Sequence, residues 1–226
     1  MDGAERLQAL AAIIRDQRDP SVVVVSAMAG VSDELSRLAD VATTGDDAPG
    51  VPDPATTLAA MKQRHLDALQ VIVKEDAARA SVAARIDEIF DGATQLLGEG
   101  PGAEAKRFTD QLMAVGEDLA VELAVSALQA EGIPAAVLNA REVVWTNSEF
   151  GAAVPDFESV RRLAPSNILP LVEDGIVPVV QGFIGSEAGG ATTTLGRGGS
   201  DFTATLLGAA LGSPEVILWT DVDGIH

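Results

Sequence analysis

The chain of 226 residues contains no cysteine and only two histidines. Without cysteine, disulfide bonds and thiolate metal sites are excluded. The two histidines, His65 and His226, lie far apart in the sequence, which argues against a histidine-based metal site. Aromatic residues make up only 4% of the chain and hydrophobic residues 47%, so we expect a core packed mainly by aliphatic side chains.

Basic residues are also scarce, because 15 Lys and Arg stand against 34 Asp and Glu and give a formal net charge of −19. Nucleic acids and anionic membranes both require a basic surface, so this balance argues strongly against either as a partner. A protein this acidic can bind an anion only where cations and backbone dipoles are placed locally. Arg197, which lies inside a glycine-rich segment, is therefore a candidate anion ligand.

Long apolar runs are absent too. No run reaches the roughly 18 residues that a membrane-spanning helix needs. The N-terminus, with Asp2 and Glu5 beside Arg6, lacks the basic-then-apolar pattern of a secretory signal. We therefore expect a cytoplasmic protein. The length allows one large domain or two small ones, and we favour a single domain.

Short, apolar, β-branched runs predict strands that are buried on both faces of a parallel sheet. Helical spacing of apolar residues predicts the connecting helices, and two further helices without any strand signal between 55 and 97. This alternation predicts an α/β fold, a three-layer αβα sandwich around a mostly parallel sheet. The expected strands are 21–25, 135–138, 176–180 and 215–219. The other expected helices are 4–18, about 34–39 after a small-residue turn at 26–33, 109–130, 158–173 (interrupted by Pro165 and Pro170) and 202–211. We expect a loop at 41–54, and an irregular segment or a hairpin at 145–156.

The segment from Thr192 to Asp201 is the most informative part of the chain. It joins a run of hydroxyl side chains to a glycine-rich turn, and a helical pattern follows at once and ends at Gly212. Glycine lets the backbone approach a ligand closely, and a helix N-terminus presents free N–H groups to an anion. Arg197 adds a planar donor fork that suits a carboxylate or a phosphate. The segment therefore predicts an anion site at the carboxyl edge of the sheet, where open α/β sheets bind ligands.

Four segments in register resemble the catalytic domain of aspartate kinases, in the amino acid kinase superfamily. They are Val23 to Ser32, Phe108 to Glu117, Val179 to Asp201, and Trp219 to Ile225. The resemblance covers essentially the whole chain and implies the fold that amino acid kinases share with carbamate kinase. The stretch at about 55–98 resembles the helical insertion of the lysine-sensitive and homoserine-dehydrogenase-fused subgroups.

The resemblance implies a reaction, in which the γ-phosphate of ATP moves to the β-carboxylate of L-aspartate and gives 4-phospho-L-aspartate. ATP and Mg²⁺ are the implied cofactors. The implied pathway is lysine, threonine and methionine biosynthesis. Such a reaction depends on positioning and charge neutralisation more than on covalent help from the protein.

Residue roles also follow from the resemblance. Arg197 is implied to hold the α-carboxylate of aspartate and Glu117 its α-ammonium. Ser32, where the family usually has threonine, is implied to contact the substrate through its hydroxyl. Asp201 is implied to orient phosphate-binding lysines and is our candidate catalytic residue. The remaining implied site residues are Thr194, Gly198, Gly199 and Ser200 beside the substrate, and Thr220, Asp221 and His226 (where many members have tyrosine) beside the nucleotide.

The chain also departs from the family pattern. It lacks the Lys-Phe-Gly-Gly-Thr-Ser-like phosphate loop, the Thr-Asp-Pro-Arg segment with the later nucleotide-binding lysine, and the C-terminal regulatory ACT domains. We therefore expect part of a longer enzyme, whose partner is a second copy or the remaining segments. Two alternatives to an aspartate kinase remain open, an inactive amino-acid-binding fragment and a kinase of another small acid such as glutamate or acetylglutamate.

Structural roles are the alternative for individual residues. Ser200 is a candidate helix cap, as is Ser32. Thr220 and Asp221 suit an ordinary turn after a strand. For Trp219 we expect a place in the core, and for His65 a solvated or half-buried helix face without a functional role.

Overall fold

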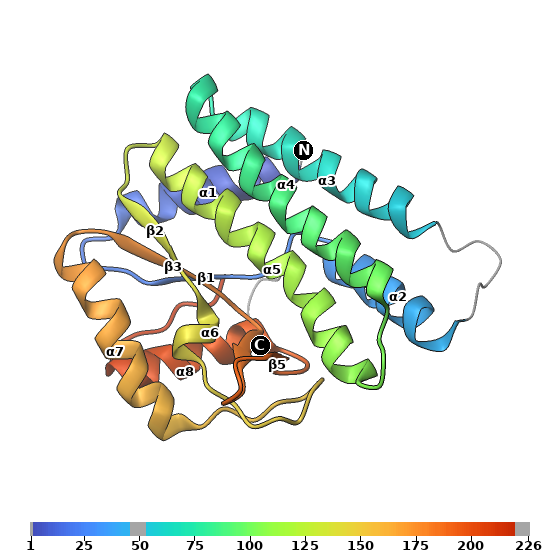
Figure 1. Cartoon of the computed structure of the whole chain (residues 1–226). Helices are drawn as coiled ribbons and strands as arrows, with labels where there is room; N and C mark the ends of the chain where they lie inside the picture. Colours follow the sequence, from blue (N-terminus) through green and yellow to red (C-terminus); the bar gives the residue numbers. More distant parts are fainter. Residues whose placement is uncertain (1, 46–52, 220–226) are drawn as a thin grey trace, which may run out of the picture.

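The computed structural model describes residues 2–45 and 53–219 (Figure 1). Three short strands form a parallel sheet in the order β1-β3-β2: β1 (Val23–Val25), β2 (Ala135–Leu138) and β3 (Val177–Gln181). In the register of this sheet, Val179 of β3 is paired with Val23 on one side and Val137 on the other. The first three predicted strands and their parallel arrangement are thus confirmed.

Helices cover both faces of this sheet, which confirms the three-layer prediction. Neighbouring residues of β3 point to opposite faces, so Val179 packs with α1 and α5 and Val180 packs with α7 and α8. Figure 1 shows α5 crossing one face, with α7 and α8 on the other. The bounds of these helices are α1 Asp2–Asp16, α5 Ala105–Ala130, α7 Phe157–Glu173 and α8 Gly199–Leu211.

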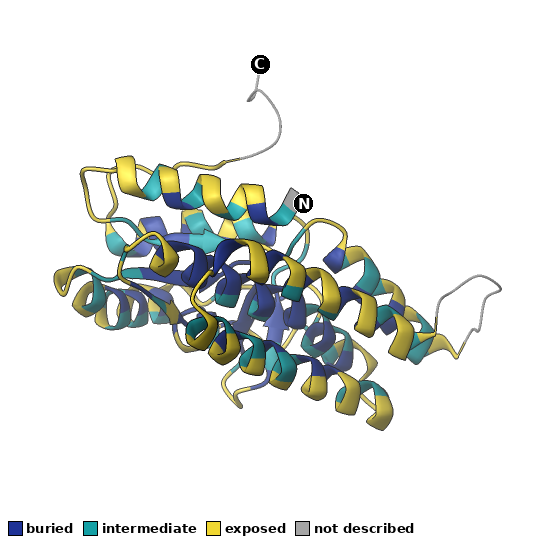
Figure 2. Cartoon of the chain, turned by 90° about the horizontal axis from the view of Figure 1, so that it is seen from above, coloured by how far each residue is buried: buried dark blue, intermediate teal, exposed yellow. Residues whose placement is uncertain are grey.

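A second core lies outside the sheet, among helices only. The two helices predicted between 55 and 97 are present as α3 (Pro54–Ile72) and α4 (Asp76–Glu99), and they pack with α2 (Val31–Thr44) and α5. Figure 2 shows the buried residues concentrated on the inner faces of the helices, with exposed residues on the outer faces. Because α5 contributes to all three hydrophobic clusters, it is the common wall of the sheet layers and the helical layer.

Some boundaries and small elements differ from the predictions. The helix α5 begins at Ala105 rather than near Thr109, and α7 continues through Pro165 and Pro170 as one helix whose inner face is buried against α8. A short helix, α6 (Ala140–Val143), was not predicted. Neither was the antiparallel hairpin of β4 (Ile184–Ser186) and β5 (Thr192–Thr194). Three-residue strands are too short to give a clear alternating pattern.

The fourth predicted strand is wrong. Residues 215–219 form no strand, and Ile217, Leu218 and Trp219 are exposed, so Trp219 is not a core residue. The segment packs on α8 through Val216, whose side chain lies so close to Gly208 that no Cβ would fit there. A β-branched sequence permits a strand, but a strand also needs a hydrogen-bonded neighbour, and this segment has none within the described residues.

His65 also differs from the expected position. It is fully buried in the helical core, where its ring meets Phe90 edge-on at a centroid distance of 6.0 Å.

Of the helices in residues 2–45 and 53–219, none has the length and apolar character needed to cross a membrane.

Candidate active site

The carboxyl ends of β1 and β3 meet the start of α8. The N–H of Gly182, just after β3, donates to the carbonyl of Val25 at the end of β1 (2.8 Å). Gly182 has no room for a side chain, because a Cβ there would lie 2.6 Å from the Cβ of Ser200. The predicted edge of the sheet is therefore joined directly to the first turn of α8.

The glycine-rich turn has the backbone conformation that its sequence predicts. Gly196 and Gly198 have positive φ angles of 76° and 70°, a region that L-residues rarely adopt. Gly199 is packed against Phe183, so a Cβ there would lie 2.6 Å from the Phe183 ring. The N-cap of α8 is Gly198, so Ser200 lies inside the first turn and is not the cap.

Two charged side chains of this turn point outward. Arg197 is exposed and forms no ion pair or hydrogen bond within the part of the chain that the structure describes. Asp201, in the first turn of α8, is exposed as well, and its carboxylate has no ion-pair partner among the same residues. Ser200 between them is half-buried. The fork of Arg197 is thus available for a ligand.

The hydroxyl run that precedes the turn is used inside the protein. Thr192 accepts a hydrogen bond from Arg141 (2.8 Å), and Thr193 shares one with Thr146 (2.7 Å). Thr194 is buried and its hydroxyl donates to Asp110 (2.7 Å). These hydroxyls therefore fasten the hairpin to its surroundings, and the anion site that we predicted from this segment is reduced to the turn itself.

Glu117 is the second charged group of the candidate site. Gly116 lets α5 approach the turn after β1, since a Cβ there would lie 2.9 Å from the Cβ of Ala27. Glu117 is consequently buried, with 3% of its surface exposed, and its Oε2 has no hydrogen-bond partner among the described residues. The pKa of Glu117 is raised to about 8. Burial is the largest cause, a hydrogen bond with the backbone of Ala27 lowers the pKa, and the charge of Asp118 raises it. Glu117 therefore does not lie on a solvated face of its helix.

The same contact brings the start of α2 beside Glu117. A Cβ on Gly116 would lie 3.0 Å from Cγ1 of Val31, the first residue of α2. Ser32, the next residue, is half-buried. The N-cap of α2 is Gly30, with a φ of 81°, so Ser32 is not the cap. The structure therefore brings the first turn of α2, which contains Ser32, close to Glu117.

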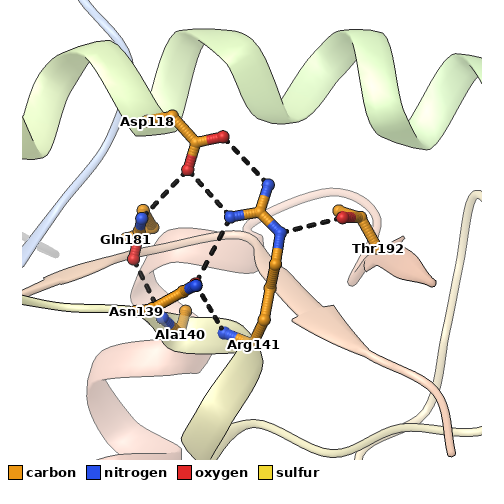
Figure 3. A network of polar contacts seen from close by, with 6 residues as sticks. All are labelled: Asp118, Asn139, Ala140, Arg141, Gln181 and Thr192. Carbon is orange, nitrogen blue, oxygen red and sulfur yellow. Dashed lines mark hydrogen bonds and ion pairs between the residues drawn. The ribbon is translucent and has the colours of Figure 1, made fainter. Parts of the chain in front are cut away.

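A polar network next to Glu117 was missed by the sequence analysis (Figure 3). Arg141 forms a bidentate ion pair with Asp118, with nitrogen–oxygen distances of 2.8 and 2.9 Å. Gln181 donates to the same carboxylate (2.9 Å) and accepts from the N–H of Ala140 (2.9 Å). Together with the bond from Arg141 to Thr192, these contacts tie α5, the end of β2, the end of β3 and the hairpin together.

Asp110 was also missed as a candidate residue. It lies in the segment Phe108 to Glu117 that resembles aspartate kinases, near the start of a predicted helix, but we assigned it no role; in the structure it lies inside α5 and is fully buried. The residues expected beside the nucleotide, Thr220, Asp221 and His226, lie outside the described residues. Within 2–45 and 53–219 there is no group of three or more histidine, aspartate or glutamate side chains that could hold a metal ion.

The chain is similar in sequence to known proteins of one family. A sequence model described as the amino acid kinase family matches residues 1–226. Lysine-sensitive aspartokinase 3 of Escherichia coli (strain K12) is 34% identical over 218 residues, covering 95% of this chain and 45% of that protein. The aspartokinase of Chlamydia muridarum is 34% identical over 220 residues, covering 97% of this chain and 45% of that protein.

Solved structures show the same fold. The crystal structure of E. coli aspartokinase III in complex with aspartate and ADP matches with a TM-score of 0.87 at 33% identity, over 98% of this chain and 47% of that chain. The complex of that enzyme with lysine and aspartate matches with a TM-score of 0.84. The chain thus spans less than half the length of these relatives.

Proposed function

Because the chain belongs to the amino acid kinase family, we propose that it forms the aspartate-binding part of an aspartate kinase. The proposed reaction transfers the γ-phosphate of ATP to the β-carboxylate of L-aspartate. Support comes from relatives named aspartokinases and from the similarity to an aspartokinase III structure whose complex contains aspartate and ADP.

The observation that carries the proposal is the carboxylate of Glu117. It is buried, one of its oxygens has no partner within the described residues, and it lies at the edge of the sheet beside the start of α2. A buried carboxylate without a partner is costly, and a ligand ammonium group would supply both the charge and the hydrogen bond that it lacks. The α-ammonium of aspartate fits this requirement.

Arg197 provides the complementary charge. Its exposed guanidinium has no partner within the described residues, and the glycines on either side leave the backbone free of other side chains. A guanidinium binds a carboxylate through two parallel hydrogen bonds. Arg197 would hold the α-carboxylate of aspartate while Glu117 holds its ammonium, and Ser32 and Ser200 would add hydroxyl contacts.

The chemistry requires little beyond this positioning. The β-carboxylate of aspartate is already a nucleophile, so no general base is needed. What the protein must do is hold two anions together and in line, which orientation and fixed charges achieve. The first turn of α8 directs free backbone N–H groups toward the turn, and Asp201 would orient the cations that hold the phosphates.

Nucleotide and metal complete the proposal. Mg²⁺ would neutralise phosphate charge when it is bound. Such an ion is commonly held by substrate phosphates and one or two carboxylates. Thr220, Asp221 and His226 would lie beside the nucleotide.

Isothermal titration calorimetry on the full chain tests the proposal. We expect L-aspartate to bind, and succinate, which lacks the ammonium group, to bind at least about 50-fold more weakly because Glu117 then stays unpaired. Absence of aspartate binding, or preference for glutamate or N-acetylglutamate, would contradict the assignment. Titration with Mg·ATP and a coupled assay for ADP follow. Aspartate binding without turnover would indicate a binding fragment.

A further inference from the structure

Asp110 is a buried carboxylate that no role described so far uses. It lies in α5 with none of its surface exposed. Its Oδ2 accepts hydrogen bonds from the backbone N–H groups of Gly151 and Thr194, both at 2.9 Å, and its Oδ1 accepts one from the hydroxyl of Thr194 at 2.7 Å. All three donors are distant in sequence, with Thr194 84 residues away. A carboxylate is desolvated at such a place only where several donors replace the lost water.

The donors that Asp110 collects belong to the base of the glycine-rich turn. Thr194 is the last residue of β5 and lies three positions before Arg197. The carbonyl of Thr194 accepts a bond from Ala153 (2.8 Å), and the N–H of Leu195 donates to Phe183 (2.8 Å). Asp110 therefore holds one end of the turn at a point where the backbone is bonded on both sides.

The loop that contains Gly151 supports the turn from the other side. If Gly196 carried a Cβ, that atom would lie 3.7 Å from the carbonyl oxygen of Gly151 and 3.8 Å from Ala152. The Gly151 N–H donates to Asp110 and the Ala153 N–H donates to the carbonyl of Thr194, so this loop is bonded to the base of the turn. The carboxylate of Asp110 thus fixes two backbone segments next to Arg197, the base of the glycine-rich turn and the loop that contains Gly151.

The same helix carries Glu117, seven residues further along. Seven residues are nearly two full turns, so Asp110 and Glu117 lie on one face of α5, about 10 Å apart along its axis. Both are buried on the side that faces the sheet edge and the hairpin. A rigid helix that binds the turn at Asp110 and presents a carboxylate at Glu117 sets the spacing between the two charges that aspartate must bridge.

We propose that Asp110 is a positioning residue for substrate binding, which fixes the turn of Arg197 at a set distance from Glu117 through its three hydrogen bonds. The inference rests on the proposed function, since it gives a purpose to the spacing of the two ligand-binding charges. It concerns the hydrogen bonds of Asp110 and not its charge, and this distinction makes it testable.

Two substitutions separate hydrogen bonding from charge. In Asp110→Asn the amide oxygen can accept both backbone N–H groups, and the amide nitrogen can donate to the Thr194 hydroxyl, which is able to accept. We expect Asp110→Asn to bind L-aspartate within about threefold of the wild-type chain. Asp110→Ala removes both acceptor oxygens and with them all three hydrogen bonds, and we expect at least a tenfold weaker affinity, which corresponds to the loss of a typical buried hydrogen-bond partner. Equal loss in both variants would assign the effect to charge and overturn the proposal.

Ser126→Ala is the matched control. Ser126 is another buried polar residue of α5, and its hydroxyl donates to the carbonyl of Glu122 (2.6 Å), away from the hairpin. We expect it to leave the aspartate affinity unchanged. If Asp110→Ala lowers thermal stability while the folded protein binds aspartate as well as the wild type, Asp110 is only structural and the proposal fails.

Hydrogen exchange of the unliganded chain gives a reading that does not depend on aspartate. In Asp110→Ala, the amides of Gly151 and Thr194 should exchange about tenfold faster, together with those of Leu195 to Arg197. Unchanged exchange there would overturn the proposal even if affinity changed. If wild-type protein fails to bind aspartate, the proposed function falls, and the exchange data still decide whether Asp110 holds the turn.

A second variant covers the case in which Asp110→Ala does not fold. Thr194→Val keeps the volume and the backbone N–H but removes the hydroxyl bond to Asp110. We expect a smaller increase in exchange, about threefold, confined to residues 194–197. No increase in Thr194→Val would count against the proposal.

Discussion

Glu117 of α5 and His65 of α3 share an unusual property, because each has a buried polar atom without a hydrogen-bond partner among the described residues. These atoms are Oε2 of Glu117 and Nε2 of His65. In both residues burial shifts the pKa toward the neutral form, upward for Glu117 and downward for His65. The two side chains therefore impose a similar kind of cost on the folded chain.

Their surroundings differ. His65 lies in an apolar helical core, where its Nδ1 contacts the carbonyl oxygen of Met61 (2.7 Å) and its ring meets Phe90. Glu117 lies where α5 passes the ends of two strands, next to the Asp118–Arg141 pair and the turn at Ala27. An unpaired atom that is enclosed by apolar side chains does not lie where a ligand binds. An unpaired atom at the carboxyl edge of a sheet does lie where ligands bind. The comparison thus predicts a functional role for Glu117 and a structural one for His65.

Glu117→Gln should produce the largest effect on ligand binding. It removes the charge that we propose pairs with the ammonium of aspartate, at nearly constant volume. Truncating one partner of a buried charge pair costs about 2–5 kcal/mol, so we expect aspartate affinity to fall at least about 50-fold in calorimetry. Glu122→Gln is the control on the same helix, where the carboxylate pairs with Arg85 instead. An unaffected affinity in Glu117→Gln would remove the distinction between the two buried groups.

The same variant should stabilise the unliganded chain at alkaline pH. The pKa of Glu117 is about 8 in the folded chain against 4.5 for the free group, so between these values the folded state holds the extra proton. The contribution of Glu117 to the free energy of unfolding therefore decreases as pH rises from about 4.5 to 8, and the loss is complete above 8. We expect the free energy of unfolding of Glu117→Gln to exceed that of the wild type by on the order of 5 kcal/mol at pH 9 in urea unfolding, and by little at pH 4. A constant difference across this range would contradict the raised pKa.

Arg197→Lys tests the second charged group that we propose binds aspartate. Lysine keeps the positive charge but loses the planar fork, so a bidentate contact with the aspartate α-carboxylate becomes a single one. We expect roughly tenfold weaker aspartate binding with unchanged thermal stability, because Arg197 is exposed and unpaired within the described residues. Unchanged affinity would mean that Arg197 does not hold the carboxylate.

His65→Leu should give the smallest effect, and none on binding. Because burial lowers the pKa of His65 below 6.5, the unfolded chain takes up more protons than the folded chain as pH falls past 6.5. The contribution of His65 is therefore fully present above pH 6.5 and decreases below it. We expect the stability of His65→Leu to depend less on pH between 5 and 7, by up to about 1.4 kcal/mol per pH unit. A changed aspartate affinity in this variant would contradict the purely structural role of His65.

Local sequence features correctly predicted much of the fold. The short apolar runs identified β1, β2 and β3, and the helical periodicity identified α3 and α4. The turn glycines were predictable because positive φ angles favour glycine wherever they occur. Residues 215–219 and Trp219 were misplaced, since the same apolar pattern does not reveal whether a neighbouring strand is available.

The candidate site divides in the same way. Glu117 and Arg197 were predicted from motifs that resemble a known family, and their proposed roles stay predictions until binding is measured. Asp110, Asp118, Arg141 and Gln181 were not predicted, because each acts through partners that the sequence places 23 to 84 residues away. Nothing in the local pattern around a carboxylate on a helix shows which backbone it will meet.

The sequence by itself determined the family, the layered α/β arrangement and the conformation of the glycine-rich turn, because these depend on periodicity, backbone freedom and motif spacing. Only the tertiary structure decided which polar groups are buried and whether they find partners. It paired Asp110 with Thr194, used the threonine hydroxyls internally, and left one oxygen of Glu117 and one nitrogen of His65 unpaired within the described residues. The physical reason is that burial and hydrogen bonding depend on contacts between distant segments, which form only when the layers pack.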